Sequence, residues 1–162
     1  MLRDPVVIEH LNNTLTNELT AINHYFLHAR ILQHWGVTKL GKFEYHQSID
    51  EMKHADELIQ RVLFLGGLPN LQKLNQLAIG ETVEEILKAD LNLEETALGE
   101  LREGIAYCES VRDYVSRDLL DRILKSEEEH VDFLERQFDL IKLVGIERYT
   151  LLNAASAPEQ ES

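Results

Sequence analysis

The chain has 162 residues and a formal net charge of −13, from 29 acidic and 16 basic side chains. This length fits one domain with a substantial core, and a hydrophobic share of 44% argues against disorder throughout. The charge argues against nucleic acid or an anionic membrane as the main partner, and is compatible with attracting cations or with solubility alone. The single cysteine, Cys108, excludes a disulfide within the chain and a metal site built from several cysteines. Residues 1–20 contain no signal-peptide pattern and no run could span a membrane, so we expect a cytoplasmic protein.

Helix signals begin at the first residues of the chain. Asp4 followed by Pro5 predicts an N-cap and a proline in the first helical turn. The apolar residues that follow keep a period of about 3.6 until Gly36, which predicts a first long helix. A second helix is expected over 39–65, because Gly66 and the glycine after it form a stop signal.

The second half of the chain repeats this pattern after a long connection. Residues 66–81 have no strong period and predict that connection. Thr82 and Glu85 have the spacing of a capping box, which opens a third helix. A turn near 113–116 is weakly marked; a fourth helix follows it, and a short fifth helix is expected over 146–152.

Four long helices joined by two short loops and one long crossover define the expected fold. Short loops make neighbouring helices antiparallel, whereas a long crossover lets the second and third helices run parallel. The sequence therefore predicts an all-α, ferritin-like four-helix bundle with one long crossover and a short fifth C-terminal helix. We expect one ferritin-like domain over residues 1–153 and a disordered tail over 154–162.

The motif Glu-x-x-His occurs twice, once in each half of the chain. One copy means little in a chain this rich in glutamate. Each copy, however, follows another glutamate by 33 residues, and the two sets are offset by 76 residues. The repeated pattern consists of Glu18, Glu51 and His54, and of Glu94, Glu127 and His130. It places one Glu on each odd-numbered helix and one Glu-x-x-His on each even-numbered helix, the arrangement of a carboxylate-bridged di-metal site in a helical bundle.

Glu18 and Glu94 each lie in an apolar stripe of their predicted helix. A carboxylate in such a stripe is costly to bury unless it is paired or bound to a metal. The competing interpretation places both at the edges of the stripes, in contact with water. A single glutamate could well lie at such an edge, but this interpretation does not explain why all six residues of the repeated pattern occur together.

Four carboxylates and two imidazoles can hold two divalent cations with balanced charge. We expect Glu18 and His54 to bind one ion, Glu94 and His130 the other, and Glu51 and Glu127 to bridge them. These donors suit iron, manganese or zinc, of which iron supplies redox chemistry. Tyr25 follows Glu18 by two helical turns, so its hydroxyl is either a hydrogen-bond partner of the ligands or part of the core.

Met52 lies between Glu51 and His54 but faces elsewhere. At 100° per residue it points about 130° away from the mean direction of those two side chains. From this position alone, Met52 is part of the outer surface or of a subunit interface.

Four segments of the chain resemble the bacterioferritin family: "NELTAINHYFLHAR", "EYHQSIDEMKHADELIQRVLFLGGLPNLQ", "DYVSRDLL" and "SEEEHVDFLE". The resemblance runs from about residue 3 to 153 and implies a hollow shell of 24 subunits that stores iron. In that family a di-iron ferroxidase oxidises Fe²⁺ with O₂ or H₂O₂, and Fe³⁺ accumulates as mineral in the cavity. All six residues of the repeated pattern match the family's di-iron ligands.

The resemblance also implies roles for residues outside the repeated pattern. Met52 matches an axial ligand of haem b, which this family binds across a two-fold interface with one such Met from each subunit. His46 and Asp50 match an iron site on the inner surface of some members. Positions matching the docking surface for a bacterioferritin-associated ferredoxin are Leu68, Glu81 and Glu85. Gly66 and His34 fall at a pore of the shell, where many relatives carry Glu and Asn, so the route of iron through that pore is open.

Two other functions compete with the ferroxidase. One is a haem-binding shell subunit with a structural or electron-transfer role and little ferroxidase activity, assembled with another subunit type. The intact ligand set argues against it. The other is a helical bundle without ligands, whose Glu and His side chains lie at the surface. The sequence leaves open whether a di-iron centre would cycle as a stable cofactor or pass iron inward.

Overall fold

The computed structural model describes residues 3–154 and 157 of the chain, and the described part contains helices and no strand. The helices are α1 (Pro5–His34), α2 (Thr38–Phe64), α3 (Val83–Ser110), α4 (Tyr114–Val144) and α5 (Ile146–Leu152). The prediction of an all-α, ferritin-like bundle is confirmed. The predicted tail over 154–162 lies outside the described residues except for 154 and 157.

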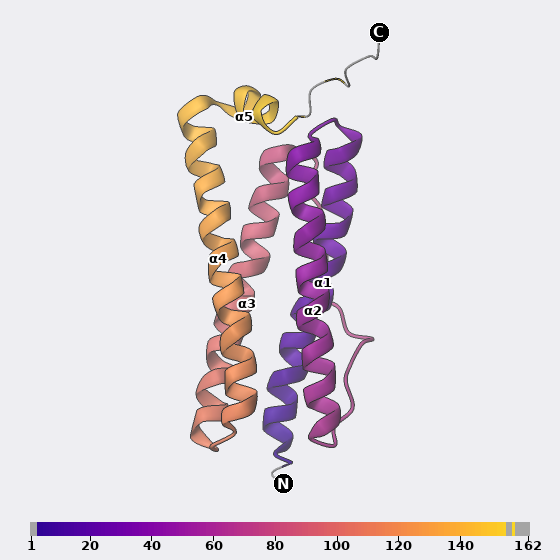
Figure 1. Ribbon diagram of the computed structural model, residues 1–162, viewed down its shortest axis with the longest axis vertical. Helices are drawn as coiled ribbons and strands as arrows, with labels where there is room; N and C mark the ends of the chain where they lie inside the picture. The colour runs from indigo at the N-terminus through magenta and orange to yellow at the C-terminus, as the bar shows by residue number, and fades with distance from the viewer. Residues whose placement is uncertain (1–2, 155–156, 158–162) are drawn as a thin grey trace.

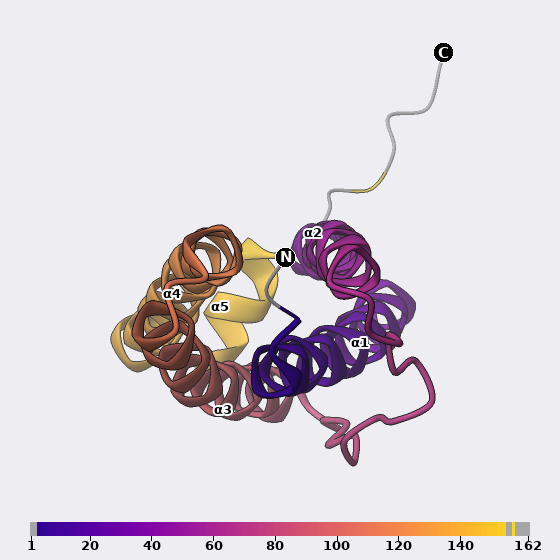
Figure 2. The same cartoon turned by 90° about the horizontal axis from the view of Figure 1, so that it is seen from below.

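The four long helices form two antiparallel hairpins, α1 with α2 and α3 with α4 (Figure 1). The end-on view of Figure 2 shows the two hairpins side by side, with the α2–α3 crossover running along the outside of the bundle. The short α5 lies across the end of the bundle opposite the N-terminus. No helix in the described part is long and apolar enough to cross a membrane.

The predicted helix starts are made by specific side chains. Asp4 caps α1 by accepting hydrogen bonds from the backbone N–H groups of Val6 and Val7, at 2.8 and 3.4 Å. Thr82 caps α3 by accepting from the N–H of Glu85 at 3.1 Å. The Glu85 carboxylate accepts from the N–H of Glu81, rather than from that of Thr82, so only half of the predicted capping box forms.

The predicted turn near 113–116 is wrong by a few residues. The chain turns at 111–113, and α4 begins at Tyr114. Asp113 is the N-cap: its carboxylate accepts from the Ser116 N–H at 3.0 Å and also pairs with Arg61 of α2 at 2.9 Å. Arg112 takes the positive φ of this turn, 62°, a conformation in which glycine or asparagine would have been the recognisable signal.

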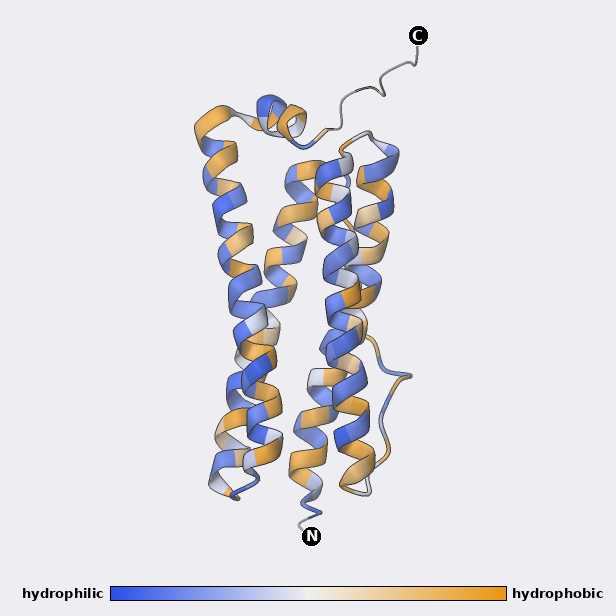
Figure 3. Cartoon of the chain, in the orientation of Figure 1, coloured by the Kyte–Doolittle hydropathy of each residue, from blue (hydrophilic) through white to orange (hydrophobic). Residues whose placement is uncertain are grey.

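Polar side chains in the middle of the bundle divide its apolar core in two. One cluster lies towards the end where α1 begins and includes Leu11, Leu58 and Leu120. The other lies towards α5 and includes Leu32 and Leu87. Every long helix contributes to both clusters, and its ionisable buried residues fall between them. Figure 3 shows the apolar and polar residues alternating along each helix, as expected for helices with one buried face.

Candidate metal centre

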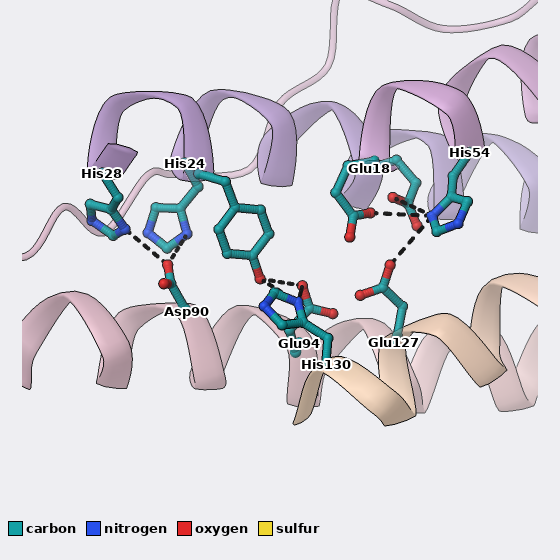
Figure 4. A network of polar contacts seen from close by, with 10 residues as sticks. Glu18, His24, His28, His54, Asp90, Glu94, Glu127 and His130 are labelled. Carbon is teal, nitrogen blue, oxygen red and sulfur yellow. Dashed lines mark hydrogen bonds and ion pairs between the residues drawn. The ribbon is translucent and has the colours of Figure 1, made fainter. Parts of the chain in front are cut away.

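The repeated Glu…Glu-x-x-His pattern converges in the middle of the bundle, with side chains from all four long helices (Figure 4). These side chains form two overlapping groups of possible ligands, within each of which the ligand atoms lie no more than 4.8 Å apart. The first group is Glu18, Glu51, His54 and Glu127, and the second is Glu51, Glu94, Glu127 and His130. Glu51 and Glu127 belong to both groups, so they stand where carboxylates would bridge two ions.

The spacing around His54 suits common coordination better than hydrogen bonding. Its Nδ1 lies 3.5 Å from a carboxylate oxygen of Glu18, of Glu51 and of Glu127. Donor atoms bound to one ion at about 2.1 Å lie about 3.0–3.5 Å apart, depending on the coordination angle. At the other end of the centre, His130 Nδ1 lies 3.4 Å from Glu94 Oε1.

The carboxylates are buried, and several of their oxygens have no hydrogen-bond partner. Glu18, Glu51, Glu94 and Glu127 are each at most 2% exposed. The unpartnered atoms include Glu18 Oε2, Glu94 Oε2, both oxygens of Glu127, His54 Nδ1 and His130 Nε2. This burial contradicts the interpretation in which the glutamates reach water at the edges of the apolar stripes. Buried and unpaired carboxylates are costly, and two divalent cations would neutralise all four.

Proton binding in the metal-free centre follows from this burial. Burial raises the pKa of Glu18 and of Glu127, and raises that of Glu94 well above its usual value. Burial by itself would lower the pKa of His54, but the neighbouring Glu127 and Glu18 outweigh it and raise that pKa to about 10. At neutral pH the empty centre therefore retains protons, including one on His54.

We expect divalent cations to displace these protons. Because coordinating carboxylates and imidazoles must be deprotonated, Zn²⁺ binding at pH 7 should acidify a weakly buffered solution, and its apparent affinity should rise with pH. A pH indicator read during Zn²⁺ titration of the metal-free protein measures this release. The Glu18→Gln variant, which lacks one ligand, is the control with reduced release. Tight binding with no proton release would contradict the protonation described above.

Tyr25 contacts Glu94 and His130, two possible ligands from the group that does not include Glu18. Its hydroxyl donates a hydrogen bond to Glu94 and lies 3.3 Å from His130 Nδ1. Its ring is fully buried and lies 5.0 Å from the ring of His130, centroid to centroid. Tyr25 is thus both a hydrogen-bond partner of these groups and a core residue.

Met52 faces out of the bundle and is 52% exposed. Two turns earlier on α2, the ring of Tyr45 lies 6.4 Å from that of Phe26 on α1, itself 47% exposed. The α1–α2 hairpin therefore exposes both a thioether, on α2, and an aromatic ring, on α1.

The other residues singled out from the resemblance lie outside the metal centre. His46 and Asp50 are exposed on α2 and belong to none of the ligand groups in the described part of the chain. Asp50 and His54 together line a hollow of about 290 Å³ between α2 and α4. One possible metal ligand, His54, therefore lies in the wall of this hollow.

The side chains expected at a docking surface and at a pore are exposed. Leu68 is 83% exposed in the crossover, and Glu81 and Glu85 lie exposed at the start of α3. His34, the last residue of α1, and Gly66 are exposed as well. In the described part of the chain, none of these residues belongs to the groups of possible metal ligands.

Sequence reasoning overlooked a second buried polar cluster on the α5 side of the metal centre. It consists of His24 and His28 on α1, Glu44 on α2 and Asp90 on α3, each at most 2% exposed. The signal was present, because Asp90 precedes Glu94 by one turn and Glu44 precedes Glu51 by two. Neither Asp90 nor Glu44 is part of a Glu-x-x-His motif, so the repeated motif does not point to them.

Comparison with known proteins agrees with the fold. Residues 8–144 match the family described as "Ferritin-like domain". The chain is 50% identical over 161 residues to a bacterioferritin of Brucella melitensis, covering 99% of this chain and all of the relative. It is 48% identical over 155 residues to a bacterioferritin of Rhodobacter capsulatus, covering 96% of each, and 47% identical over 149 residues to one of Streptomyces coelicolor, covering 92% and 89%.

The helical bundle and the match over 8–144 define a ferritin-like protein. The extent and level of identity to the relatives then place it more closely: the chain belongs to the bacterioferritin family.

Proposed function

We propose that this protein stores iron and oxidises Fe²⁺ to Fe³⁺ at the centre formed by Glu18, Glu51, His54, Glu94, Glu127 and His130. The observation that carries the proposal is the sharing of Glu51 and Glu127 between two groups of four possible ligands. Such sharing holds two ions close enough to react as a pair. Membership of the bacterioferritin family supports iron as the metal.

The side chains present fit two ferrous ions. Unpartnered oxygens on Glu18, Glu94 and Glu127 are buried and point into the centre. The donor set combines oxygen and imidazole nitrogen, which suits Fe²⁺ and requires no cysteine. Four carboxylates balance the charge of two divalent cations, so filling the centre removes the cost of burying them.

In the proposed reaction two Fe²⁺ give up two electrons, which with two protons reduce one O₂ to H₂O₂ or one H₂O₂ to two waters. The chain's own residues bind and orient the iron pair. Glu51 and Glu127 fix the separation of the ions, and Tyr25 holds Glu94 in place through its hydrogen bond. The apolar clusters on both sides limit access of water to the centre.

The experiment is an anaerobic Fe²⁺ titration of the metal-free protein, followed by mixing with O₂ or H₂O₂ while absorbance is recorded. Saturation at two Fe²⁺ per chain with oxidation much faster than in buffer is the expected result. The absence of a saturable pair, or oxidation no faster than in buffer, would contradict the proposal. It would leave a haem-bearing structural subunit, assembled with another subunit type, as the better hypothesis.

Haem b is the second proposed cofactor, held by Met52 and by the same residue of a partner subunit. The exposed thioether and the exposed Phe26 on the paired helix α1 support this. A thioether can ligate haem iron, and apolar side chains suit the porphyrin. Haem b would supply a one-electron relay across the subunit interface.

The remaining features of the proposal rest on family membership. They are a cytoplasmic shell of 24 subunits built from residues 1–153, an inner-surface iron site at His46 and Asp50, and ferric mineral inside the shell. A bacterioferritin-associated ferredoxin would dock near Leu68, Glu81 and Glu85 to deliver electrons for iron release. The exposure of all these side chains is compatible with such roles.

A further inference from the structure

The buried cluster of His24, His28, Glu44 and Asp90 lies apart from the proposed di-iron ligands. Figure 4 shows His28, His24 and Asp90 on one side of Glu94 and His130, and Glu18, His54 and Glu127 on the other. Asp90 and Glu94 are one helical turn apart on α3, which separates the two regions by about 6 Å along the helix. The proposed ferroxidase does not use any of the four residues.

Several polar atoms of this cluster have no hydrogen-bond partner although they are buried. They are Nδ1 of His24, Oδ2 of Asp90 and both carboxylate oxygens of Glu44. Glu44 and Asp90 are each 0% exposed. Two carboxylates with three unpartnered oxygens at such depth are costly unless a proton or a cation lies between them.

Backbone contacts fix which nitrogen of each histidine carries the proton. The Nε2 of His24 lies 2.5 Å from the carbonyl oxygen of Ala78, so Nε2–H is the donor and Nδ1 keeps its lone pair. His28 is the reverse: its Nε2 accepts the N–H of Gly80 at 3.0 Å, so its proton is on Nδ1. That proton is donated to Asp90 Oδ1 at 2.8 Å.

Gly80 can make this contact only because it has no side chain. A Cβ at this position would lie 2.4 Å from the backbone nitrogen of Ile86 and 2.7 Å from the carbonyl carbon of Glu85. The end of the crossover is therefore packed against the start of α3, which holds the Gly80 N–H against His28. His28 is consequently a positioning residue for Asp90.

The free Nδ1 of His24 faces Asp90. The distance from this nitrogen to Asp90 Oδ1 is 3.6 Å, too long for a hydrogen bond but close to the separation of about 3.3 Å between two ligands of a tetrahedral zinc ion. A histidine that donates one ring N–H to a backbone carbonyl and presents the other nitrogen to a carboxylate has the arrangement of a metal ligand. Burial lowers the pKa of His24 to about 4, so the nitrogen is unprotonated at neutral pH.

Glu44, on α2, offers a further buried donor: it is 0% exposed, and neither of its carboxylate oxygens has a hydrogen-bond partner. Burial raises its pKa well above the usual value, and the charge of Asp90 raises it further. Burial likewise raises the pKa of Asp90, to about 8. A divalent cation between them would neutralise both carboxylates, whereas a shared proton neutralises only one.

We propose that His24 Nδ1, Glu44 and Asp90 form a third divalent-cation site in each chain, one helical turn from the di-metal centre. Two carboxylates and one imidazole suit Zn²⁺, Mn²⁺, Co²⁺ or Fe²⁺. The use of this site for Fe²⁺ rests on the proposed function, whereas the site itself does not.

The fold also provides a route to this site. A cavity of about 320 Å³ lies between α1, α3 and the crossover, and His24 and Ala78 form part of its wall. Asn17, Thr20 and Asn75 give the wall polar groups. A hydrated cation can thus approach His24 from outside the bundle without passing through the di-metal centre.

The first test is a crystal of the wild-type protein soaked in Zn²⁺, with anomalous diffraction data collected at the zinc edge. We expect a peak bonded to His24 Nδ1, Glu44 and Asp90, in addition to the peaks at the di-metal centre. Filled di-metal positions with no peak at His24 would overturn the proposal and leave a proton shared by Glu44 and Asp90. A peak at His24 with an empty di-metal centre would support this site while contradicting the proposed function.

Variants test the ligand assignment in solution. Zn²⁺ bound per chain, counted after removal of loose metal, should fall by one equivalent in His24→Gln. The glutamine amide can still donate to Ala78. His10→Gln, which alters a half-buried histidine elsewhere on α1, should leave the count unchanged. If His24→Gln does not fold, Glu44→Gln takes its place. In the Glu94→Gln background, the Zn²⁺ equivalent bound at the third site should persist. An unchanged number of Zn²⁺ per chain in both His24→Gln and Glu44→Gln would refute the site.

Discussion

Replacing Glu94 by glutamine is expected to slow Fe²⁺ oxidation by more than about 100-fold, to the rate in buffer. Even a hydrogen-bond partner of a metal ligand typically changes affinity or activity by about 10–100-fold, and Glu94 is proposed as a direct ligand. Glutamine keeps the shape of the side chain and an oxygen that can accept the Tyr25 hydrogen bond, but it removes the negative charge. Stopped-flow absorbance after mixing the Fe²⁺-loaded protein with O₂ measures the effect.

The adjacent residue provides a matched control. Glu95 is exposed on the same turn of α3, so Glu95→Gln removes the same charge without touching the centre. We expect it to oxidise Fe²⁺ as the wild type does. A Glu94→Gln protein that keeps the fast phase would show that Glu94 is not a ligand. Equal losses in the two variants would assign the effect to surface charge.

Replacing Met52 by leucine is expected to reduce bound haem to background while leaving Fe²⁺ oxidation intact. Leucine matches methionine in volume and hydrophobicity but has no sulfur lone pair to ligate iron. Met52 points away from the metal centre, so the ferroxidase should be unaffected. Haem absorbance per chain after reconstitution with haem b measures the first effect, and the Fe²⁺ oxidation assay the second.

Two further variants separate ligation from surface packing. Leu63→Ala changes a side chain of similar exposure on the same helix, 55% against 52%, and should keep its haem. Met52→His supplies a different ligand and should restore binding with an altered spectrum. Full haem content in Met52→Leu would rule out Met52 as the axial ligand and remove the main support for haem at this face.

Local signals in the sequence determined the helices and the principal cluster of ionisable residues. The Asp4 cap, the glycine at 66 and the apolar periods act within a few residues of chain, so they are readable without tertiary structure. The six-residue pattern was readable for a different reason. Its equal spacings in two halves of the chain put matching side chains at the same level of two similar hairpins, and the structure brings them together.

The tertiary structure decided which groups share a site. It placed Tyr25 against Glu94 and His130, although Tyr25 shares a helical face with Glu18. It also put the α3–α4 turn at 111–113, where Arg112 takes a positive φ that its sequence does not signal.

The cluster of His24, His28, Glu44 and Asp90 is the clearest case of a feature that only the tertiary structure reveals. Its members come from three helices, and the tautomers of its histidines are set by backbone groups of the crossover, a segment without periodicity. Periodicity assigns each side chain to a helical face. Which faces meet, and where an irregular segment places its N–H and C=O groups, depends on contacts between residues more than 50 positions apart.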